Sequence, residues 1–243
     1  MSGTNGAAMR CAGLVALGLQ AGLALADAPD AIDCKLTLGH YRSNDGNPAN
    51  DVNLRAALGP HTVWVGVYQD RAGLRQWRTG YERRDDFGPL RSVLSLQNAS
   101  GGAWVGSASA EVGGASYAIV GWGRTNLHNY VNLNYDPNDA ITLGVGTRAI
   151  DDTELSLFQV RDDRLSTGQR VTHAVLRRRF EGEQRVTVDV FAKRGLAADG
   201  RFVHDRSLTL GYDRGPWFAR LSHDPHAGFA AATQTRVSAG LRF

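Results

Sequence analysis

The chain has 243 residues, of which 42% are hydrophobic and 21% charged, and its formal net charge at pH 7 is +3. A charge so close to balance argues against nucleic acid as a partner. Arginine carries nearly all of the positive charge, because Lys35 and Lys193 are the only lysines. Arginine forms forked, multiply bonded pairs with carboxylates, so it suits a crowded polar interior better than lysine does.

The N-terminal segment has the layout of a secretory signal peptide. Met9 and Arg10 precede the uncharged apolar run Cys11–Ala26, which is too short and too rich in Ala and Gly for a convincing membrane-spanning helix. We therefore predict that residues 1–26 are a signal peptide, cleaved on export, and that residues 27–243 form one domain. An uncleaved anchor is the alternative, and translation could start at either methionine.

Short runs of alternating apolar and polar residues then follow one another to the C-terminus, separated by turn residues. Such alternation indicates β-strands with one apolar and one polar face. About fifteen runs satisfy the pattern, at residues 35–43, 52–58, 62–69, 74–84, 90–97, 103–112, 116–123, 130–135, 140–148, 153–161, 170–180, 185–194, 206–213, 217–222 and 234–243.

The two faces of these runs differ in a way that favours a barrel in lipid. In residues 185–194, for example, Val186 and Val190 lie opposite Asp189 and Lys193. An apolar outside and a wet, polar inside is the pattern of a transmembrane barrel, and closing the sheet leaves no unpaired strand edge. A soluble periplasmic barrel or sandwich is the alternative.

Aromatic residues near the ends of the runs are expected to form girdles at the two membrane interfaces. They are Trp64, Tyr68, Trp77, Tyr81, Trp104, Trp122, Tyr130, Tyr135, Tyr212, Trp217 and Phe218.

The number of strands follows from the length of the chain. Bacterial barrels with both ends in the periplasm have even strand numbers, and a tilted spanning strand needs about 9–11 residues. Allowing roughly 18 residues for a strand and its turn gives about 12 strands. We predict an all-β, antiparallel, up-and-down transmembrane β-barrel of about 12 strands, with 14 as the next choice.

The last run ends at the final residue of the chain. Val237, Ala239, Leu241 and Phe243 share its apolar face. This terminal strand resembles the assembly signal of Gram-negative outer-membrane β-barrel proteins, in which a terminal Phe and alternate apolar residues are recognised by the insertion machinery. The resemblance implies an outer-membrane location, with lipid or lipopolysaccharide and the barrel-assembly machinery as partners.

Catalytic residues are weakly indicated. Residues 40–46 resemble the HxSNG-like pattern of the outer-membrane phospholipase A family, in which a His and a Ser two residues apart share one strand face. Here His40 and Ser43 are one position further apart, so alternation places them on opposite faces. We therefore expect a protein that is not an enzyme.

The densest uncharged polar patch spans residues 124–134. It contains Arg124, Asn126, His128, Asn132 and Asn134, which could line a constriction or bind a sugar or a headgroup, or could form a solvated loop. Two further candidates for the lumen, on polar strand faces, are Arg148 and Asp189. No spacing of His, Cys or carboxylates predicts a metal site, and no motif predicts a cofactor.

The sequence thus predicts a narrow porin-like barrel, or an accessory or structural envelope protein, with an arginine-rich polar lumen that small solutes could enter. One alternative is an outer-membrane lipid hydrolase, similar to a phospholipase or a lipid A deacylase. The other is a soluble periplasmic β-barrel that binds a ligand.

Overall fold

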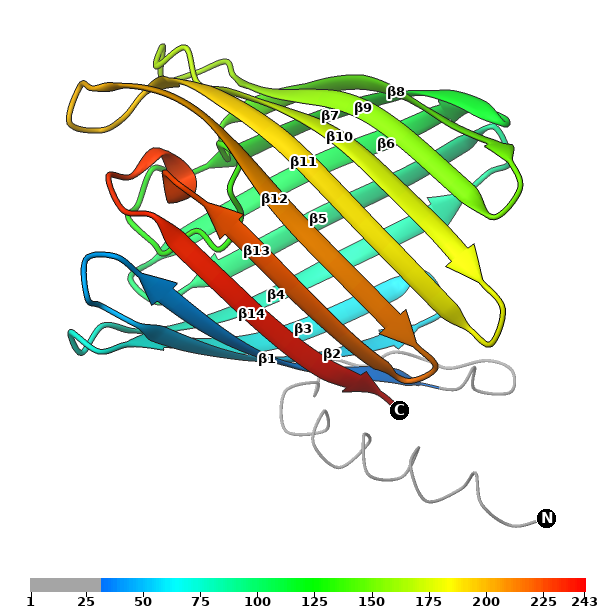
Figure 1. The fold of residues 1–243 in the computed structure, drawn as a ribbon, viewed down its shortest axis with the longest axis horizontal. Coiled ribbons are helices and arrows are strands. Elements are labelled where there is room, and N and C mark those ends of the chain that lie inside the picture. The colour runs from blue at the N-terminus through cyan, green and yellow to red at the C-terminus, as the bar shows by residue number, and fades with distance from the viewer. Residues whose placement is uncertain (1–31) are drawn as a thin grey trace.

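The computed structural model describes residues 32–243, which form a closed antiparallel β-barrel of 14 strands (Figure 1). Among these residues no helix is long and apolar enough to cross a membrane. The expected signal peptide, residues 1–26, lies outside the described residues. The elements are β1 (Asp33–Ser43), β2 (Ala49–Leu58), β3 (His61–Asp70), β4 (Arg75–Asp86), β5 (Leu90–Ala99), β6 (Ala103–Gly113), β7 (Ser116–Thr125), β8 (Ala140–Ile150), β9 (Thr153–Asp162), β10 (Arg170–Phe180), β11 (Gln184–Leu196), β12 (Phe202–Arg214), β13 (Trp217–Asp224), the 3-10 turn η1 (Ala227–Phe229) and β14 (Gln234–Arg242).

Closure joins the first strand to the last. Each strand pairs with its neighbours in sequence, and β1 pairs with β14 from Lys35 opposite Arg242 to Ser43 opposite Gln234. The described strands therefore form a sheet without an edge, in which ladder hydrogen bonds satisfy the backbone.

The all-β antiparallel barrel is confirmed, but the prediction of 12 strands is wrong. The error came from allowing too many residues for each turn, because the turns at one end of the barrel have only two or three residues. Residues 130–135 also alternate in sequence, yet they are not a strand and belong to the loop between β7 and β8.

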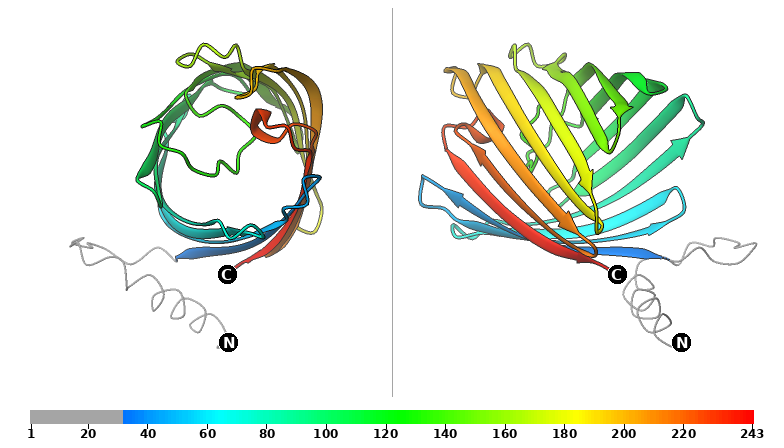
Figure 2. Two further views of the ribbon diagram at one scale, coloured as in Figure 1. Left: turned by 90° about the vertical axis from the view of Figure 1, so that its left-hand side faces the viewer. Right: turned by 45° about the vertical axis from the view of Figure 1, so that its right-hand side comes forward.

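The two ends of the barrel differ in the length of their connections (Figure 2). The end that holds Asp33 and Phe243, which we call the terminal end, has the short turns 59–60, 87–89, 114–115, 151–152, 181–183 and 215–216. The opposite end, which we call the loop end, has mostly longer connections, and residues 126–139 form the longest. Short turns at the end with the termini and longer loops at the other are typical of outer-membrane barrels.

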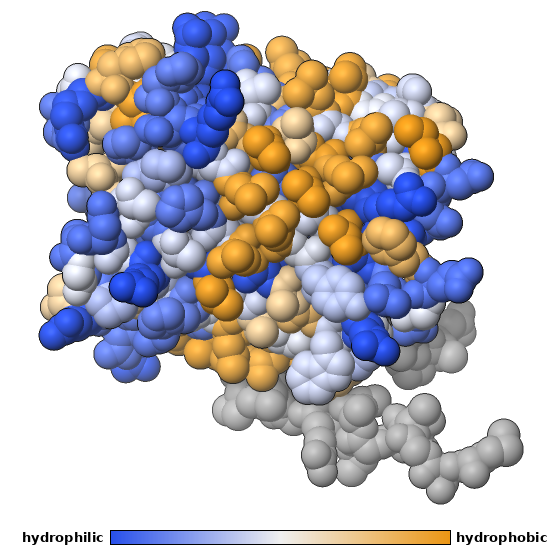
Figure 3. Space-filling model, in the orientation of Figure 1, coloured by the Kyte–Doolittle hydropathy of each residue, from blue (hydrophilic) through white to orange (hydrophobic). Residues whose placement is uncertain are grey.

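The outer face carries an apolar belt, which appears as a diagonal orange band in Figure 3. Large apolar side chains on this face are 40–60% exposed, among them Leu38, Val52, Val65, Leu94, Leu143, Val145, Leu157, Val190 and Val237. Val237 and Phe243 of the terminal strand are 53% and 43% exposed, so the apolar face of this strand also points outward.

Exposed aromatic residues flank the belt at both ends. Trp77, Trp104 and Trp122 lie towards the loop end, and Phe180, Tyr212 and Trp217 towards the terminal end. Several other aromatic residues expected in these girdles do not face outward: Trp64 and Phe218 line the lumen, Tyr68 packs against Tyr41 inside the barrel, and Tyr130 and Tyr135 lie in the inward loop.

A charge placed in the apolar belt should destabilise the barrel strongly. Val145 lies near the middle of β8 and is 60% exposed. In Val145→Arg we expect a loss of about 2–4 kcal/mol in the free energy of unfolding, measured by denaturant titration in lipid vesicles. Ser107→Arg, which places the same charge in the lumen, is the control, and equal losses in the two variants would contradict a lipid-facing outer surface.

Candidate functional site

Two loops from the loop end fold into the barrel, as the end-on view in Figure 2 shows. They are residues 126–139, between β7 and β8, and residues 225–233, between β13 and β14. Tyr135 of the first loop and Phe229 of the second belong to one buried apolar cluster, which also contains Phe191 of β11. The rings of Tyr135 and Phe191 stack with centroids 5.6 Å apart. The two loops are thus held against the wall formed by β10 to β12.

Loop 126–139 is also held by strands on the other side of the lumen. The side chain of Gln76, on β4, bonds twice to the backbone of Val131: its Nε2 donates to the carbonyl at 3.1 Å and its Oε1 accepts from the amide at 2.7 Å. Arg236, on β14, donates from Nη1 to the carbonyl of Leu133 at 3.0 Å. The loop starts on β7 and ends on β8, whereas its anchors lie on β4 and β14. The loop therefore crosses the barrel.

A histidine supplies a further anchor. The Nε2 atom of His173, on β10, lies 2.9 Å from a carboxylate oxygen of Asp136 in the loop, and its Nδ1 lies 3.0 Å from Asp189 on β11. Its ring stacks on Phe158 and Phe191, with centroids 4.7 and 5.0 Å away. The aromatic rings therefore fix the plane of the imidazole, and the two carboxylates fix both of its nitrogens.

The base of the loop is closed by Asp139, which is buried. Its carboxylate accepts from the backbone and hydroxyl of Thr125, at 3.2 and 2.6 Å, and from Nη1 of Arg164 at 2.8 Å. Burial raises the pKa of this carboxyl, but the hydrogen bonds from Thr125 and Arg164 together outweigh burial and hold the pKa below its usual value.

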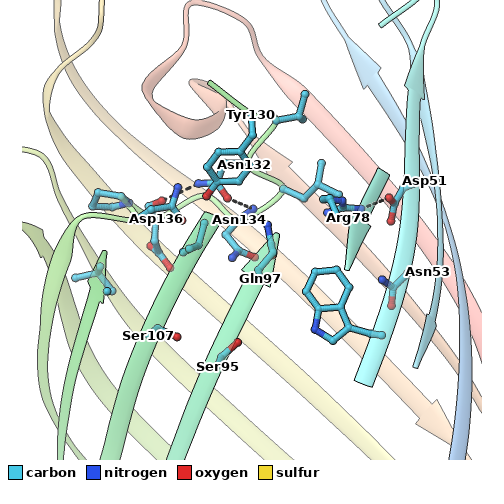
Figure 4. Close-up of a pocket in the computed structure, with 18 of the residues that line it drawn as sticks. Asp51, Asn53, Arg78, Ser95, Gln97, Ser107, Tyr130, Asn132, Asn134 and Asp136 are labelled. Carbon is cyan, nitrogen blue, oxygen red and sulfur yellow. Dashed lines mark hydrogen bonds and ion pairs between the residues drawn. The ribbon is translucent and has the colours of Figure 1, made fainter. Parts of the chain in front are cut away.

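The crossing loop has open space on both sides. A cavity of about 720 Å³ lies between the loop and the barrel wall, and a second of about 510 Å³ lies towards the loop end. Residues common to the linings of both are Tyr130, Asn132, Asp136, Pro137 and Asn138. Figure 4 shows this segment of the loop above the polar residues Ser95, Gln97 and Ser107 of the barrel wall. The loop therefore separates two cavities inside the barrel and lines both of them.

Most arginines of the lumen are paired with acids. Arg78 is bonded to Asp51, and both side chains are buried. Asp213 accepts from Arg220 at 2.8 Å and from Arg242 at 2.7 Å. Arg148 lies within 3.0 Å of both Glu111 and Glu154. These pairs brace the wall and neutralise much of its charge.

Lys35 and Arg55 are different. They face each other across the β1–β2 ladder and line the larger cavity, and in residues 32–243 neither forms an ion pair or a side-chain hydrogen bond. Each lies over an aromatic ring instead, Lys35 over Phe218 at 4.4 Å and Arg55 over Trp64 at 5.6 Å. Lys35 and Arg55 thus remain in the cavity with neither an ion pair nor a side-chain hydrogen bond among the described residues.

Of the lumen residues predicted from sequence, four lie inside the barrel. Asn132 and Asn134 lie in the crossing loop, where Asn132 donates to the carbonyl of Asp136 at 3.0 Å. Arg148 and Asp189 lie on the inner faces of β8 and β11, in the ion pairs described above.

The other three predicted lumen residues lie at the rim. Arg124 shares the outer face of β7 with Trp122, with its guanidinium 4.8 Å from the ring, and is paired with Asp163. Asn126 donates to the carbonyl of Gly102 at 2.8 Å, and Nδ1 of His128 lies 3.2 Å from the carbonyl of Gly101. Asn126 and His128 therefore fasten the crossing loop to the turn between β5 and β6.

The weak catalytic candidates do not come together. His40 points outward from β1, where its Nδ1 lies 2.9 Å from the side chain of Asn50. Ser43 lies three positions later and falls on the inner face, together with Tyr41. Among residues 32–243 no group of three His, Cys, Asp or Glu side chains could hold a metal ion.

Sequence reasoning missed the residues that anchor the crossing loop and the two unpaired cations of the larger cavity. Gln76, His173 and Arg236 show no local signal, because each acts on a loop that is distant in sequence. Lys35 and Arg55 could have been found, since alternation places both on the polar faces of their strands.

Gln76→Ala should loosen the crossing loop. The substitution removes two hydrogen bonds to Val131, so the amide of Val131 should exchange with solvent roughly tenfold faster or more, measured by hydrogen exchange. Gln97→Ala is the matched control, because Gln97 lines the same cavity and the described part of the chain offers its side chain no hydrogen bond. Equal exchange in both variants would mean that Gln76 does not anchor the loop.

Asp139 should make the stability of the barrel depend on pH. A carboxyl whose pKa is lowered by folding stabilises the folded state fully above its usual pKa, and this contribution is lost as the pH falls through the lowered pKa. The free energy of unfolding of the wild type minus that of Asp139→Asn should therefore be constant above about pH 5 and shrink below about pH 4. A difference that does not change down to pH 2 would contradict this role.

No protein-family model and no curated protein sequence matches the chain. Solved structures do match. The crystal structure of the outer membrane protein Omp33 of Acinetobacter baumannii superposes with a TM-score of 0.56 at 11% identity, covering 87% of this chain and 98% of that chain. The KdgM porin in complex with disordered oligogalacturonate (TM-score 0.48, 9% identity, 86% and 99% covered) and a mutant porin of Rhodopseudomonas blastica (0.46, 10%, 87% and 99%) superpose less well. At 11% identity the likeness to Omp33 shows a shared fold: the chain has the fold of an outer-membrane β-barrel.

Proposed function

We propose that this protein is an outer-membrane pore that passes small polar solutes and prefers anions. The observation that carries the proposal is the crossing of the lumen by loop 126–139, which is anchored on β4, β10 and β14 and has polar cavities on both sides. A structural barrel has no need of a passage, whereas a pore needs one that is both open and narrow.

The placement in the membrane follows from the two ends of the barrel. With short turns at the periplasmic side and longer loops outside, the terminal end faces the periplasm and the loop end faces the exterior. The proposal includes export by a signal peptide, residues 1–26, which leaves residues 27–243 as the barrel. It also includes recognition of the terminal strand, through Val237, Ala239, Leu241 and Phe243, by the barrel-assembly machinery.

The preference for anions rests on Lys35 and Arg55. The carboxylate that attracts Lys35 is Asp213, and the one that attracts Arg55 is Glu82. Both are already bonded to other arginines. The side chains of β5 and β6 that line the same cavity, including Ser95, Gln97, Ser107 and Ser109, are uncharged. An anion in this cavity therefore meets two cations that form no ion pair within the described part of the chain.

The test is single-channel current across a planar bilayer with the refolded barrel, with reversal potentials in a salt gradient. We expect discrete steps and an anion-selective reversal potential in the wild type. Lys35→Gln with Arg55→Gln should move the reversal potential towards zero with little change in step size. Replacing residues 129–137 by two glycines should enlarge the steps, because it removes the segment that narrows the lumen.

The matched control is Arg178→Gln with Arg214→Gln, which removes two positive charges from the outer face at the terminal end. This pair should leave selectivity unchanged. Absence of current after verified insertion would refute the pore. A current whose selectivity is the same in the wild type and in the Lys35 and Arg55 variant would refute the role of the two cations while leaving the pore standing.

A further inference from the structure

A row of basic side chains crosses the outer face of four neighbouring strands at the loop end. The ladder places Arg161 of β9 opposite Arg170 of β10, Arg170 opposite Arg194 of β11, and Arg194 opposite His204 of β12. Arg206, two positions after His204, shares the same face of β12. We call these five residues the basic row.

The row points outward. Arg161 and Arg194 share their strand faces with Leu157 and Val190, which are 54% and 46% exposed in the apolar belt. Arg161, Arg194, His204 and Arg206 are themselves exposed. In Figure 3 hydrophilic side chains gather at the loop end beside the orange belt.

Among residues 32–243 no acid balances the row. The acidic residues of β9 to β12 all lie on the inner face and have partners there or in a loop: Glu154 with Arg148, Asp162 with Thr167, Asp189 with His173, Asp205 with His226, and Asp213 with Arg220. In the flanking loops, Asp163 is paired with Arg124, and Asp199 with Arg201.

The arginines of the row are also without hydrogen-bond partners in the described part of the chain. The Nε atom of Arg170 is buried and makes no hydrogen bond. Because Arg170 lies between two other arginines, its own neighbours repel it. An unpaired cluster of this kind is unfavourable unless an anion joins it.

The row is confined to one side of the barrel. On the outer face of β2, β3 and β5 at the same end, the corresponding positions are Asn50, Gln69 and Asn98. Arg42 and Arg75 are also exposed there, but their ladder partners are Thr235 and Gln69. A general ring of cations at the membrane interface would not show this asymmetry.

Below the row, towards the middle of the barrel, the outer face becomes apolar. Gln159, Thr172 and Ala192 form the next rank, and Leu157, Val190 and Leu208 follow. Neighbouring strands lie about 4.8 Å apart, so the row spans roughly 15 Å along the leaflet. The surface thus offers several cations above an apolar wall, which suits an amphiphile with more than one anionic group.

We propose that the basic row binds the phosphates of a phosphorylated glycolipid, lipid A, while its acyl chains lie on the apolar wall below. Arginine matches phosphate with a forked pair of hydrogen bonds, and several arginines in register can hold more than one phosphate. With the loop end facing the exterior, the row lies at the headgroup level of the outer leaflet, where such a lipid is found. This site is separate from the lumen and does not depend on whether the barrel conducts.

The proposal is tested by native mass spectrometry of the refolded barrel in detergent with added lipid A. Wild-type protein should retain lipid A, and Arg170→Gln with Arg194→Gln should weaken binding on the order of tenfold or more. Arg42→Gln with Arg75→Gln removes the same charge from the same end and is the matched control, which should bind as the wild type does. The folded state of every variant is checked by its resistance to SDS without heating.

Three further measurements decide the chemistry. Dephosphorylated lipid A should bind the wild type no better than it binds the double variant. Arg170→Lys with Arg194→Lys should retain part of the binding, because charge is kept while the forked geometry is lost. Equal loss in the control pair, or equal binding of phosphatidylglycerol and lipid A by the wild type, would overturn a specific site and reduce the row to a general attraction for anionic lipid.

Discussion

The pairing of β1 with β14 is the constraint on which the rest of the structure depends. In a barrel surrounded by lipid no water is available to the backbone, so every amide and carbonyl at the edge of an open sheet would be left without a partner. The ladder from Lys35 opposite Arg242 to Ser43 opposite Gln234 removes that edge. Closure also fixes, for every strand at once, which side chains face outward and which face the lumen, because a shift of one residue would exchange the two faces.

A closed barrel of this size encloses an interior space. In this protein a loop occupies part of that space, in addition to apolar side chains. The backbone amides and carbonyls of a loop that crosses a lumen have no neighbouring strand to bond to, so they need other hydrogen-bond partners. Gln76 and Arg236 supply those partners to Val131 and Leu133, and His173 holds Asp136. The polar inner faces of the strands therefore have two roles, since they line the cavities and also fasten the loop that lies between them.

Much of this fold could be predicted from the sequence, because alternation is a local property and the barrel repeats it. The face assignments in residues 185–194 are confirmed, and the runs apart from 130–135 correspond to strands. The predicted strand number was wrong because it depends on the length of the turns, and the alternating pattern gives no information on that length. Residues 130–135 misled for a physical reason: Val131, Leu133 and Tyr135 are apolar in order to pack against the inner wall, and their backbone is bonded by distant side chains rather than by a ladder. Arg124 was predicted to line the lumen, but Gly121 and Gly123 face inward on β7 and Arg124 faces outward. Nothing in residues 116–125 alone determines which face of this strand points into the barrel.

The distribution of charge follows from the same alternation. On β9 to β12 the acids lie on the inner face, where Arg177 and Arg185 pair with them, whereas the basic row lies on the outer face with no acid beside it in residues 32–243. Inside, pairing is nearly complete, as with Asp213 and its arginines, and this keeps the lumen from holding any ion tightly. Conduction requires binding that is favourable enough to admit a solute and weak enough to release it. In the proposed pore, Lys35 and Arg55, two unpaired cations on aromatic rings, meet that requirement, whereas the longer row outside suits the proposed lipid, which stays bound.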